Sequence, residues 1–264
     1  ERTAREAAAR AGDIVCWHEN AATYRVNAPA EDRSAWEDAL DGPTVKWAGA
    51  LARELKINLA LPMTGHYDGG RRNLVVFLDR AGKVNTVYAK VHLTYGERQA
   101  GLLPGERWPV AELDFGRVGA IVCHDMSFPE SVRCLALGGA EVVFWPTHWS
   151  GWGDRLNYAV IESRAIDNAL WLAPVGLAPP PGRAWRPGMN IARSGVIDPF
   201  GEYVASAGMT GSMAMAEIDL DKPRIAHSFS TGGDHDFRSW MLADRRPDTY
   251  GAICDTDLRP EPPV

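Results

Sequence analysis

The stretch GAIVCHDMSFPE, from Gly119 to Glu130, places a cysteine between an apolar run and the sequence signature of a helix start. Val118–Val122 is continuously apolar, which is typical of a buried strand. Residues 127–130, Ser-Phe-Pro-Glu, have the form of a capping box with proline in the first turn, and this predicts a helix over Phe128–Leu137. The pattern therefore predicts Cys123 at the end of a strand, close to a helix N-terminus.

Cys123 permits two interpretations. Cysteine is among the most buried residue types, so a thiol at a strand end is often part of the core. A helix N-terminus, however, stabilises a thiolate, so this placement also predicts a lowered pKa for Cys123 and an accessible nucleophile. A nucleophilic thiol needs a base. His124 is a poor candidate because successive strand side chains point to opposite faces, and Asp125 is equally consistent with a helix cap.

Apolar runs alternate with amphipathic stretches along the chain, and no shift in composition marks a domain boundary. We expect helices over Thr44–Leu55 and Arg155–Ala169, and strands over Asp13–Trp17, Ile57–Leu61, Asn73–Leu78, Val84–Tyr88, Glu141–Trp145, Trp171–Val175, Met189–Ile197, Tyr203–Ala205 and Ser212–Ile218. Continuous apolar strands alternating with helices indicate buried sheets covered by helices, and tight turns add antiparallel pairs. The sequence predicts one α/β domain over residues 1–264, with mixed sheets.

Composition and charge narrow the class of protein. The net charge of −6 and the lack of a basic run argue against a nucleic-acid partner. The sequence holds no apolar stretch of about 18 residues, so we expect no membrane span. The spacing of the four cysteines fits neither a zinc ribbon nor a dense disulfide scaffold, which favours a reduced, cytoplasmic location. His92, His148 and Cys134 have no recognisable ligand spacing, so we expect neither a metal nor a cofactor.

Two further charged residues follow predicted strands. Glu19 comes just after Asp13–Trp17, and Lys90 comes just after Val84–Tyr88. Each charge alone would usually be a solvated surface group. Because the carboxyl ends of strands gather active-site residues in open α/β sheets, a carboxylate, an ammonium and the thiol of Cys123 could meet at one site.

These segments resemble the nitrilase superfamily, also called carbon–nitrogen hydrolases, whose catalytic triad is Glu-Lys-Cys. GDIVCWHENAATY (12–24) is similar to the family's first glutamate segment, NLVVFLDRAGKVNTVYAKVHL (73–93) to its lysine segment, and GAIVCHDMSFPE to its cysteine segment. ESRAIDN (162–168) and RRPDTYG (245–251) also resemble family landmarks. The resemblance implies Glu19, Lys90 and Cys123 as catalytic residues, a four-layer α-β-β-α sandwich, no metal, and a homo-oligomer.

The sequence departs from the family pattern in places. The family begins with a strand before the helix that we expect near residue 3, so an edge strand of one sheet is expected to be missing from these residues. His18 stands where proline is usual, and neither Met126 nor Ser127 is the arginine that many relatives carry after the cysteine. We therefore expect a substrate without a carboxylate at that position. The family's second glutamate, which orients the lysine and the substrate, corresponds best to Glu97.

Further residues are expected around the substrate. Trp145, His148 and Trp149 follow a predicted strand exit and could line an aromatic pocket, although such tryptophans could equally belong to the core or to an interface. The backbone N–H of His124 is expected to stabilise an oxyanion together with Lys90.

The resemblance favours a hydrolase of non-peptide C–N bonds that acts on a small amide or N-carbamoyl compound through a thioester on Cys123. The residues after the cysteine, His124 and Asp125, look like those of the amidase and carbamoylase branches, whereas nitrilases usually show Trp-Glu there. The alternatives are a nitrilase, a catalytically inactive binding protein that keeps the fold, and a Cys-His hydrolase that uses His148 as base.

Overall fold

The computed structural model describes residues 1–23, 38–148, 154–177, 193–208, 212–222, 224–228 and 232–258. The chain divides into two compact units, Glu1–Lys222 and Pro223–Val264. Each unit is described by itself, and the expectation of a single domain over residues 1–264 stays a prediction.

One sheet of the first unit has four strands in the order β1-β2-β3-β4. The strands are β1 (Ile14–Cys16), β2 (Asn58–Tyr67), β3 (Gly70–Leu78) and β4 (Val84–Ala89). β1 pairs with β2 in parallel, whereas β2, β3 and β4 form two successive antiparallel hairpins. The sheet is therefore mixed, as expected. Asp68 and Gly69 turn the first hairpin with positive φ angles of 49° and 77°, which matches a tight primed turn.

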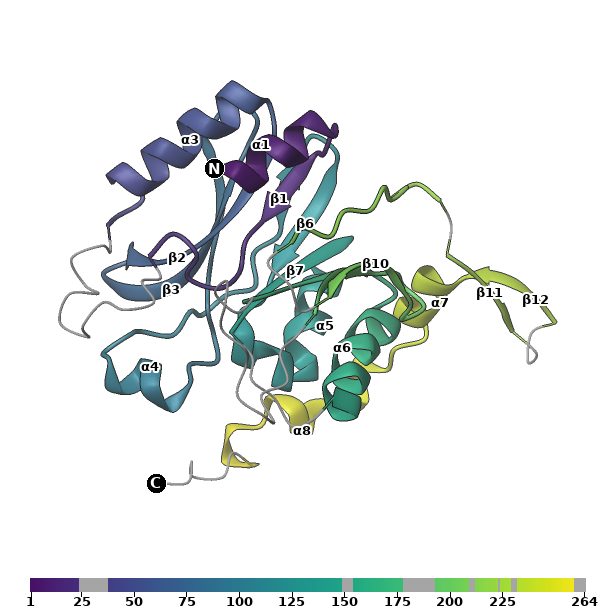
Figure 1. Cartoon of the computed structure of the whole chain (residues 1–264). Helices are drawn as coiled ribbons and strands as arrows, with labels where there is room; N and C mark the ends of the chain where they lie inside the picture. The colour runs from purple at the N-terminus through teal and green to yellow at the C-terminus, as the bar shows by residue number, and fades with distance from the viewer. Residues whose placement is uncertain are drawn as a thin grey trace. The chain divides into compact units, whose positions relative to one another are not determined.

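The other sheet has six strands in the order β10-β9-β8-β7-β6-β5. The strands are β5 (Ala111–Leu113), β6 (Gly116–Ala120), β7 (Val142–Thr147), β8 (Trp171–Gly176), β9 (Ser194–Ile197) and β10 (Tyr203–Gly208). β6, β7 and β8 run in parallel at its centre. The crossover helices are α5 (Pro129–Leu137) and α6 (Asp154–Asn168), which lie on the outer face of this sheet (Figure 1).

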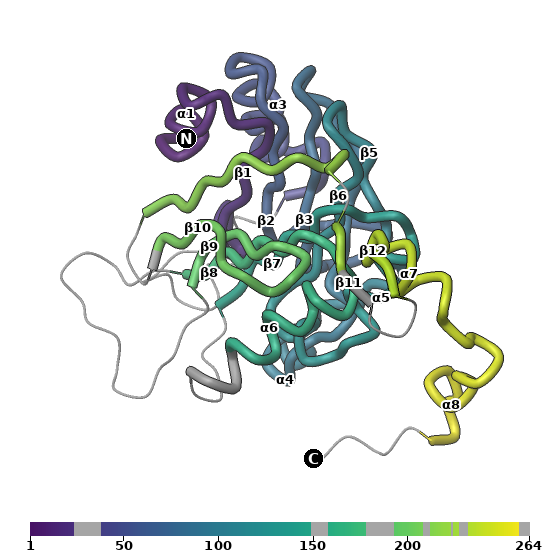
Figure 2. Tube along the Cα trace, turned by 90° about the vertical axis from the view of Figure 1, so that its right-hand side faces the viewer, coloured from purple at the N-terminus to yellow at the C-terminus, as the bar shows by residue number. Residues whose placement is uncertain are grey.

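Side-chain alternation along the strands builds the layers. On β2, Leu59 and Leu61 join the cluster that packs under α1 (Arg2–Ala9) and α3 (Pro43–Leu55), while Ala60 faces the second sheet. On β7, Phe144 belongs to the cluster between the sheets and Trp145 to the one under α5 and α6. In two views, α1 and α3 lie on one side of the strands and α5 and α6 on the other (Figures 1 and 2). The expected α-β-β-α sandwich is confirmed.

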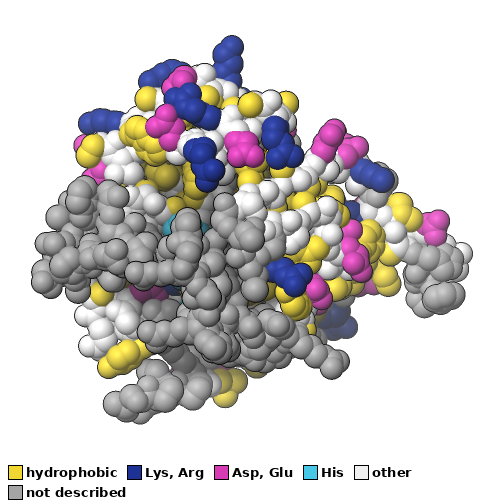
Figure 3. All heavy atoms as spheres, in the orientation of Figure 1, with side chains coloured by type: hydrophobic (Ala, Val, Ile, Leu, Met, Phe, Trp, Pro, Cys, Tyr) yellow, Lys and Arg dark blue, Asp and Glu magenta, His cyan; other side chains and the backbone are white. Residues whose placement is uncertain are grey.

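The outer helices carry charges of both signs. Arg5 of α1 pairs with Glu54 of α3 at 2.6 Å and with Glu1 at 3.0 Å. Basic and acidic side chains are interspersed over this layer on the face shown in Figure 3. In the part of the chain that the structure describes, no helix is both long and apolar enough to cross a membrane.

The second unit is built from short elements: β11 (Ile225–Ser228), β12 (Gly233–Asp236), α7 (Phe237–Ala243) and α8 (Gly251–Cys254). β11 and β12 pair in an antiparallel ribbon. The carboxylate of Asp236 accepts the backbone N–H of Ser239 at 2.8 Å and so caps α7.

The structure differs from the expected elements in several places. Residues 212–218 do not form a strand; their apolar pattern arises because Met213 packs against the cluster under α1 and α3 and Ile218 against the cluster between the sheets. β2 continues beyond Leu61 to Tyr67, and α4 (Tyr95–Gln99) is a short helix that we did not expect. Of the expected strand Met189–Ile197, residues 189–192 lie outside the described residues.

Candidate active site

The chain turns sharply at Cys123. β6 ends at Ala120, Val122 is extended, and Cys123 has a φ of +43° and begins a 3₁₀ helix over Cys123–Ser127, here called the Cys123 turn. A left-handed φ is uncommon for a residue with a β-carbon and stores strain of about 1–3 kcal/mol. Because of this turn, the direction of the Cys123 side chain does not follow the alternation of side chains along β6, which ends at Ala120.

The expected capping box at the start of α5 is wrong. α5 begins at Pro129, with the extended Phe128 as its N-cap. Because the Cys123 turn intervenes, Ser127 lies one residue too early to cap the helix, and its Oγ lies 3.3 Å from Nδ1 of His124 instead. Cys123 therefore begins a short turn of its own, and this turn separates it from the start of α5 along the chain.

Glu19 lies in the turn that follows β1 and is only 4% exposed. Its Oε1 accepts hydrogen bonds from Nζ of Lys90 at 3.1 Å and from Nδ2 of Asn73 at 2.8 Å. Its Oε2 accepts the backbone N–H of His148 at 3.0 Å. Elements of both sheets therefore fix the orientation of this carboxylate.

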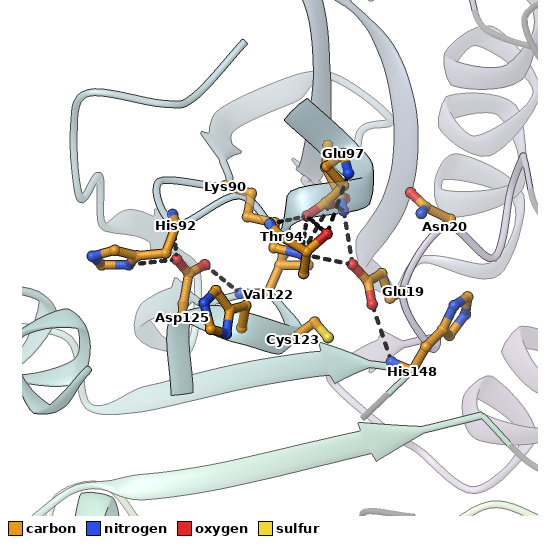
Figure 4. Close-up of polar contacts among 12 residues, drawn as sticks. Glu19, Asn20, Lys90, His92, Thr94, Glu97, Val122, Cys123, Asp125 and His148 are labelled. Atoms are coloured by element: carbon orange, nitrogen blue, oxygen red, sulfur yellow. Dashed lines mark hydrogen bonds and ion pairs between the residues drawn. The ribbon is translucent and has the colours of Figure 1, made fainter. Parts of the chain in front are cut away.

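Lys90 follows β4 and is 1% exposed. Its Nζ bonds to Glu19 and, at 2.9 Å, to the carboxylate of Glu97 on α4. Nδ2 of Asn73 bridges both carboxylates at 2.8 Å. Figure 4 shows this network, with the sulfur of Cys123 directed toward Glu19 and His148. The structure thus brings Glu19, Lys90, Glu97 and Cys123 to one place.

Glu97 is held by its own helix. Thr94 caps α4 in a capping box: the backbone N–H of Glu97 donates to Oγ1 of Thr94, and Oε2 of Glu97 accepts from the backbone N–H and the hydroxyl of Thr94 at 2.8 and 2.9 Å. Oε1 of Glu97 is left for Lys90 and Asn73.

The charges in the site stabilise one another. Burial would lower the pKa of Lys90, but the carboxylates of Glu19 and Glu97 raise it above its usual range. Burial opposes ionisation of Glu97, yet Lys90 and Asn73 together lower the pKa of that carboxyl. Lys90 is therefore an ammonium between two carboxylates.

The pKa of Cys123 is raised, so the expectation of a low pKa was wrong. Burial has the largest effect and the Glu19 carboxylate adds to it, and together they raise the pKa to about 12 against the opposing effects of Lys90, Thr147 and the backbone N–H of His148. The thiol is therefore protonated at neutral pH.

The expected substrate-binding residues have different positions. Trp145 is fully buried in the core, and its Nε1 donates to the carbonyl of Cys123 at 3.0 Å, so it supports the turn and cannot line an open pocket. His124 and His148 are half-buried, and burial lowers the pKa of each imidazole. Nε2 of His148 lies 3.2 Å from Nδ1 of His18, the residue before Glu19. Trp149 lies outside the described residues.

Sequence reasoning missed Asn73 and Thr94 as members of the site. Thr94 could have been found, because Thr94-Tyr-Gly-Glu97 has the capping-box form. Asn73 gives only the weak signal of a polar residue that opens an apolar strand. Within the described residues, no group of three or more His, Cys, Asp or Glu side chains is arranged to hold a metal ion.

Comparison with known proteins identifies the class. The family model described as carbon–nitrogen hydrolase matches residues 1–225. The chain belongs to the carbon–nitrogen hydrolase family, and the resemblance seen in the sequence is confirmed. It is 29% identical over 264 residues to the deaminated glutathione amidase of Rattus norvegicus, with 93% of this chain and 76% of that protein covered.

Solved structures share the fold. An amidase from Nesterenkonia sp. AN1 superposes with a TM-score of 0.75 at 22% identity, over 96% of this chain and 90% of that one. A carbon–nitrogen hydrolase from Helicobacter pylori G27 gives a TM-score of 0.76 at 22% identity, over 97% and 92%. A glutamate-to-glutamine variant of the Nesterenkonia amidase carries the product of Michael addition of acrylamide at its active-site cysteine.

Proposed function

We propose that the protein hydrolyses the C–N bond of a small amide or N-carbamoyl compound through a thioester on Cys123, with Glu19 as the base and Lys90 as the electrostatic stabiliser. The observation that supports this most is the buried pair of Glu19 and Lys90, joined at 3.1 Å, toward which the sulfur of Cys123 is directed. Such a pair is costly to bury, and perturbed ionisable groups cluster at functional sites.

The first half of the reaction forms the thioester. Because the thiol of Cys123 is protonated in the free enzyme, Glu19 removes its proton as sulfur attacks the carbonyl carbon. The carbonyl oxygen becomes an oxyanion beside the ammonium of Lys90 and the backbone N–H of His124. The tetrahedral intermediate then expels ammonia or an amine, which takes the proton from Glu19, and the acyl group stays on sulfur.

The second half releases the product. Glu19, again a carboxylate, removes a proton from water, and the resulting hydroxide attacks the thioester carbon. The new oxyanion is stabilised as before. Its collapse breaks the C–S bond, and the proton held by Glu19 returns to sulfur, so that the acid leaves and the enzyme is restored. Glu97 and Asn73 keep Lys90 in place through both halves of the reaction. Glu97 accepts a hydrogen bond from Nζ of Lys90, and Asn73 donates to the carboxylates of Glu19 and Glu97.

The substrate class is inferred from the residues after the nucleophile. Met126 is fully buried and Ser127 contacts His124, so neither position offers a cation to a substrate carboxylate. A neutral group at this position fits best. Amide chemistry is favoured over nitrile chemistry because the site offers an ammonium and N–H donors to an oxyanion, and because amidases are among the relatives. The small-molecule partner, the homo-oligomer and the cytoplasmic location belong to this proposal.

The experiment is ammonia release from matched series of amides, N-carbamoyl compounds and nitriles that share one side group. We expect turnover of amides or N-carbamoyl compounds by the native protein and none by Cys123→Ala. Cys134→Ala is the matched control, because Cys134 is exposed. Turnover of nitriles alone would contradict the amidase assignment, and no turnover in any series would favour a binding protein.

A further inference from the structure

Asp125 is the third residue of the Cys123 turn and is completely buried. Its carboxylate accepts four hydrogen bonds. Oδ1 accepts the backbone N–H and the Nδ1–H of His92, both at 2.9 Å. Oδ2 accepts the hydroxyl of Tyr88 at 2.6 Å and the backbone N–H of Val122 at 2.8 Å. Figure 4 shows Asp125 between His92 and Val122.

Two of the contacts hold the nucleophile. Val122 immediately precedes Cys123, and it both donates its N–H to the Asp125 carboxylate and accepts the backbone N–H of Asp125 at 3.0 Å. These bonds close a loop around Cys123, whose φ of +43° persists only if its surroundings impose it.

The other contacts hold the lysine. Tyr88 lies two residues before Lys90 and His92 lies two residues after it. The Asp125 carboxylate therefore forms hydrogen bonds with the chain on both sides of Lys90. The ring of Tyr88 stacks on Trp108 at 5.6 Å, and the ring of His92 stacks on Phe128 at 3.8 Å. The lysine segment and the Cys123 turn come from different sheets, and Asp125 joins them directly.

We propose that Asp125 is a positioning residue that fixes the distance between the sulfur of Cys123 and the ammonium of Lys90. This inference rests on the proposed function, in which those two groups act on the same carbonyl. It concerns a residue that touches neither the substrate nor the reacting atoms.

The negative carboxylate is specifically required. All four partners are N–H or O–H donors, and a carboxylate offers acceptors on both oxygens. Burial and the Asp125 carboxylate raise the pKa of Tyr88 well above its usual range, so Tyr88 stays a donor. Asparagine has the same shape, but its amide NH₂ group is a donor and would replace one of the two acceptor oxygens. In one orientation it would face the two donors of His92, and in the other it would face the donors of Tyr88 and Val122. Asp125→Asn therefore disrupts the connection without creating a cavity.

The test compares kcat and KM of Asp125→Asn with those of the native protein. We expect kcat to fall at least about 100-fold, as for loss of a transition-state donor, while KM changes less than about threefold. Ser131→Ala is the matched control: the Ser131 hydroxyl donates to the backbone carbonyl of Asp125 at 3.0 Å and is equally buried, but it does not touch the carboxylate. Ser131→Ala is expected to lower the melting temperature and to keep kcat within about threefold.

Tyr88→Phe provides a second measurement if Asp125→Asn does not fold. It keeps the ring and removes the hydroxyl, which donates to Asp125 at 2.6 Å and accepts the backbone N–H of Val91 at 3.3 Å. The loss of the short bond to the charged carboxylate should lower kcat about tenfold. A folded Asp125→Asn or Tyr88→Phe with native kcat would overturn the inference, as would an equal loss of kcat in Ser131→Ala. Hydrolysis by Cys123→Ala would overturn the proposed function, and this inference with it.

Discussion

At the residue scale, Glu19 acts on Cys123 in two opposite ways. Its negative charge disfavours the thiolate and helps to raise the pKa of Cys123 to about 12, yet the same carboxylate is the proposed acceptor of the thiol proton. A resting thiol that is neutral avoids adventitious oxidation and alkylation, because the thiolate is the reactive form. The proton then moves only when a substrate is in place.

Glu19→Gln should separate these two effects. In the native protein we expect the rate of alkylation by iodoacetamide to keep rising beyond pH 9, because the pKa of Cys123 is raised. Removing the Glu19 charge should lower the pKa of Cys123, so the pH profile of alkylation should shift toward lower pH in the variant. Hydrolysis should fall by about 100-fold or more, because the general base is lost. Mass spectrometry of the labelled peptide gives the alkylation rate. An unchanged or higher midpoint in the variant would mean that Glu19 does not act on the thiol.

Lys90→Arg is expected to be severe although it keeps the charge. Lys90 is buried between two carboxylates at 2.9 and 3.1 Å, and a planar guanidinium cannot replace a compact ammonium there. We expect kcat to fall by at least about 100-fold, as for loss of an oxyanion donor, with the circular dichroism of the native fold retained. Near-native kcat would remove Lys90 from the mechanism.

At the element scale, the short helix α4 presents Glu97 to Lys90. Thr94 both caps α4 and binds Oε2 of Glu97 through its hydroxyl. Thr94→Ala should lower stability by about 1 kcal/mol and kcat about tenfold, since a hydrogen bond to a charged carboxylate is lost. Thr94→Ser keeps the hydroxyl and should restore both quantities. A Thr94→Ala variant that loses stability but keeps kcat would limit Thr94 to helix capping.

Sequence patterns predicted where most elements lie but not all of their ends, and not the turns that make the site. The apolar run before Cys123 predicts the buried strand, because buried parallel strands have no polar alternation. β6 covers Gly116–Ala120 and so begins and ends two residues earlier than the expected Val118–Val122. The positive φ of Cys123 carries no local signal: it depends on the buried Asp125 and on Trp145, whose positions are set by distant parts of the chain. The same dependence on tertiary contacts explains why Asn73 was missed and why the sequence could not decide between the pocket and the core for Trp145.

At the scale of the whole molecule, the order of strands and helices along the chain indicated buried sheets covered by helices. The arrangement in four α-β-β-α layers was predicted correctly by the family resemblance. Alternation within the strands could not show that the two sheets pack on each other. The packing of the two sheets was predicted from the segments around Glu19, Lys90 and Cys123, because each of them resembles a segment of the family.

The same resemblance predicts a homo-oligomer, which light scattering of the purified protein at micromolar concentration can test. We expect a mass of at least twice the chain mass of 28.9 kDa. A monomer across a tenfold range of concentration would contradict the prediction and would leave the chemistry of the site unaffected, because the described members of the site come from one chain.

The most direct test of the account is whether an acyl group becomes attached to Cys123 during turnover. The protein would be mixed with an amide that it hydrolyses, quenched in acid within milliseconds to seconds, and digested for mass spectrometry. We predict a peptide containing Cys123 that is heavier by the acyl group, sensitive to hydroxylamine as a thioester is, and absent from Cys123→Ala. Hydrolysis at full rate with no adduct on Cys123 at any quench time, or with the acyl group on another residue, would contradict the central claim.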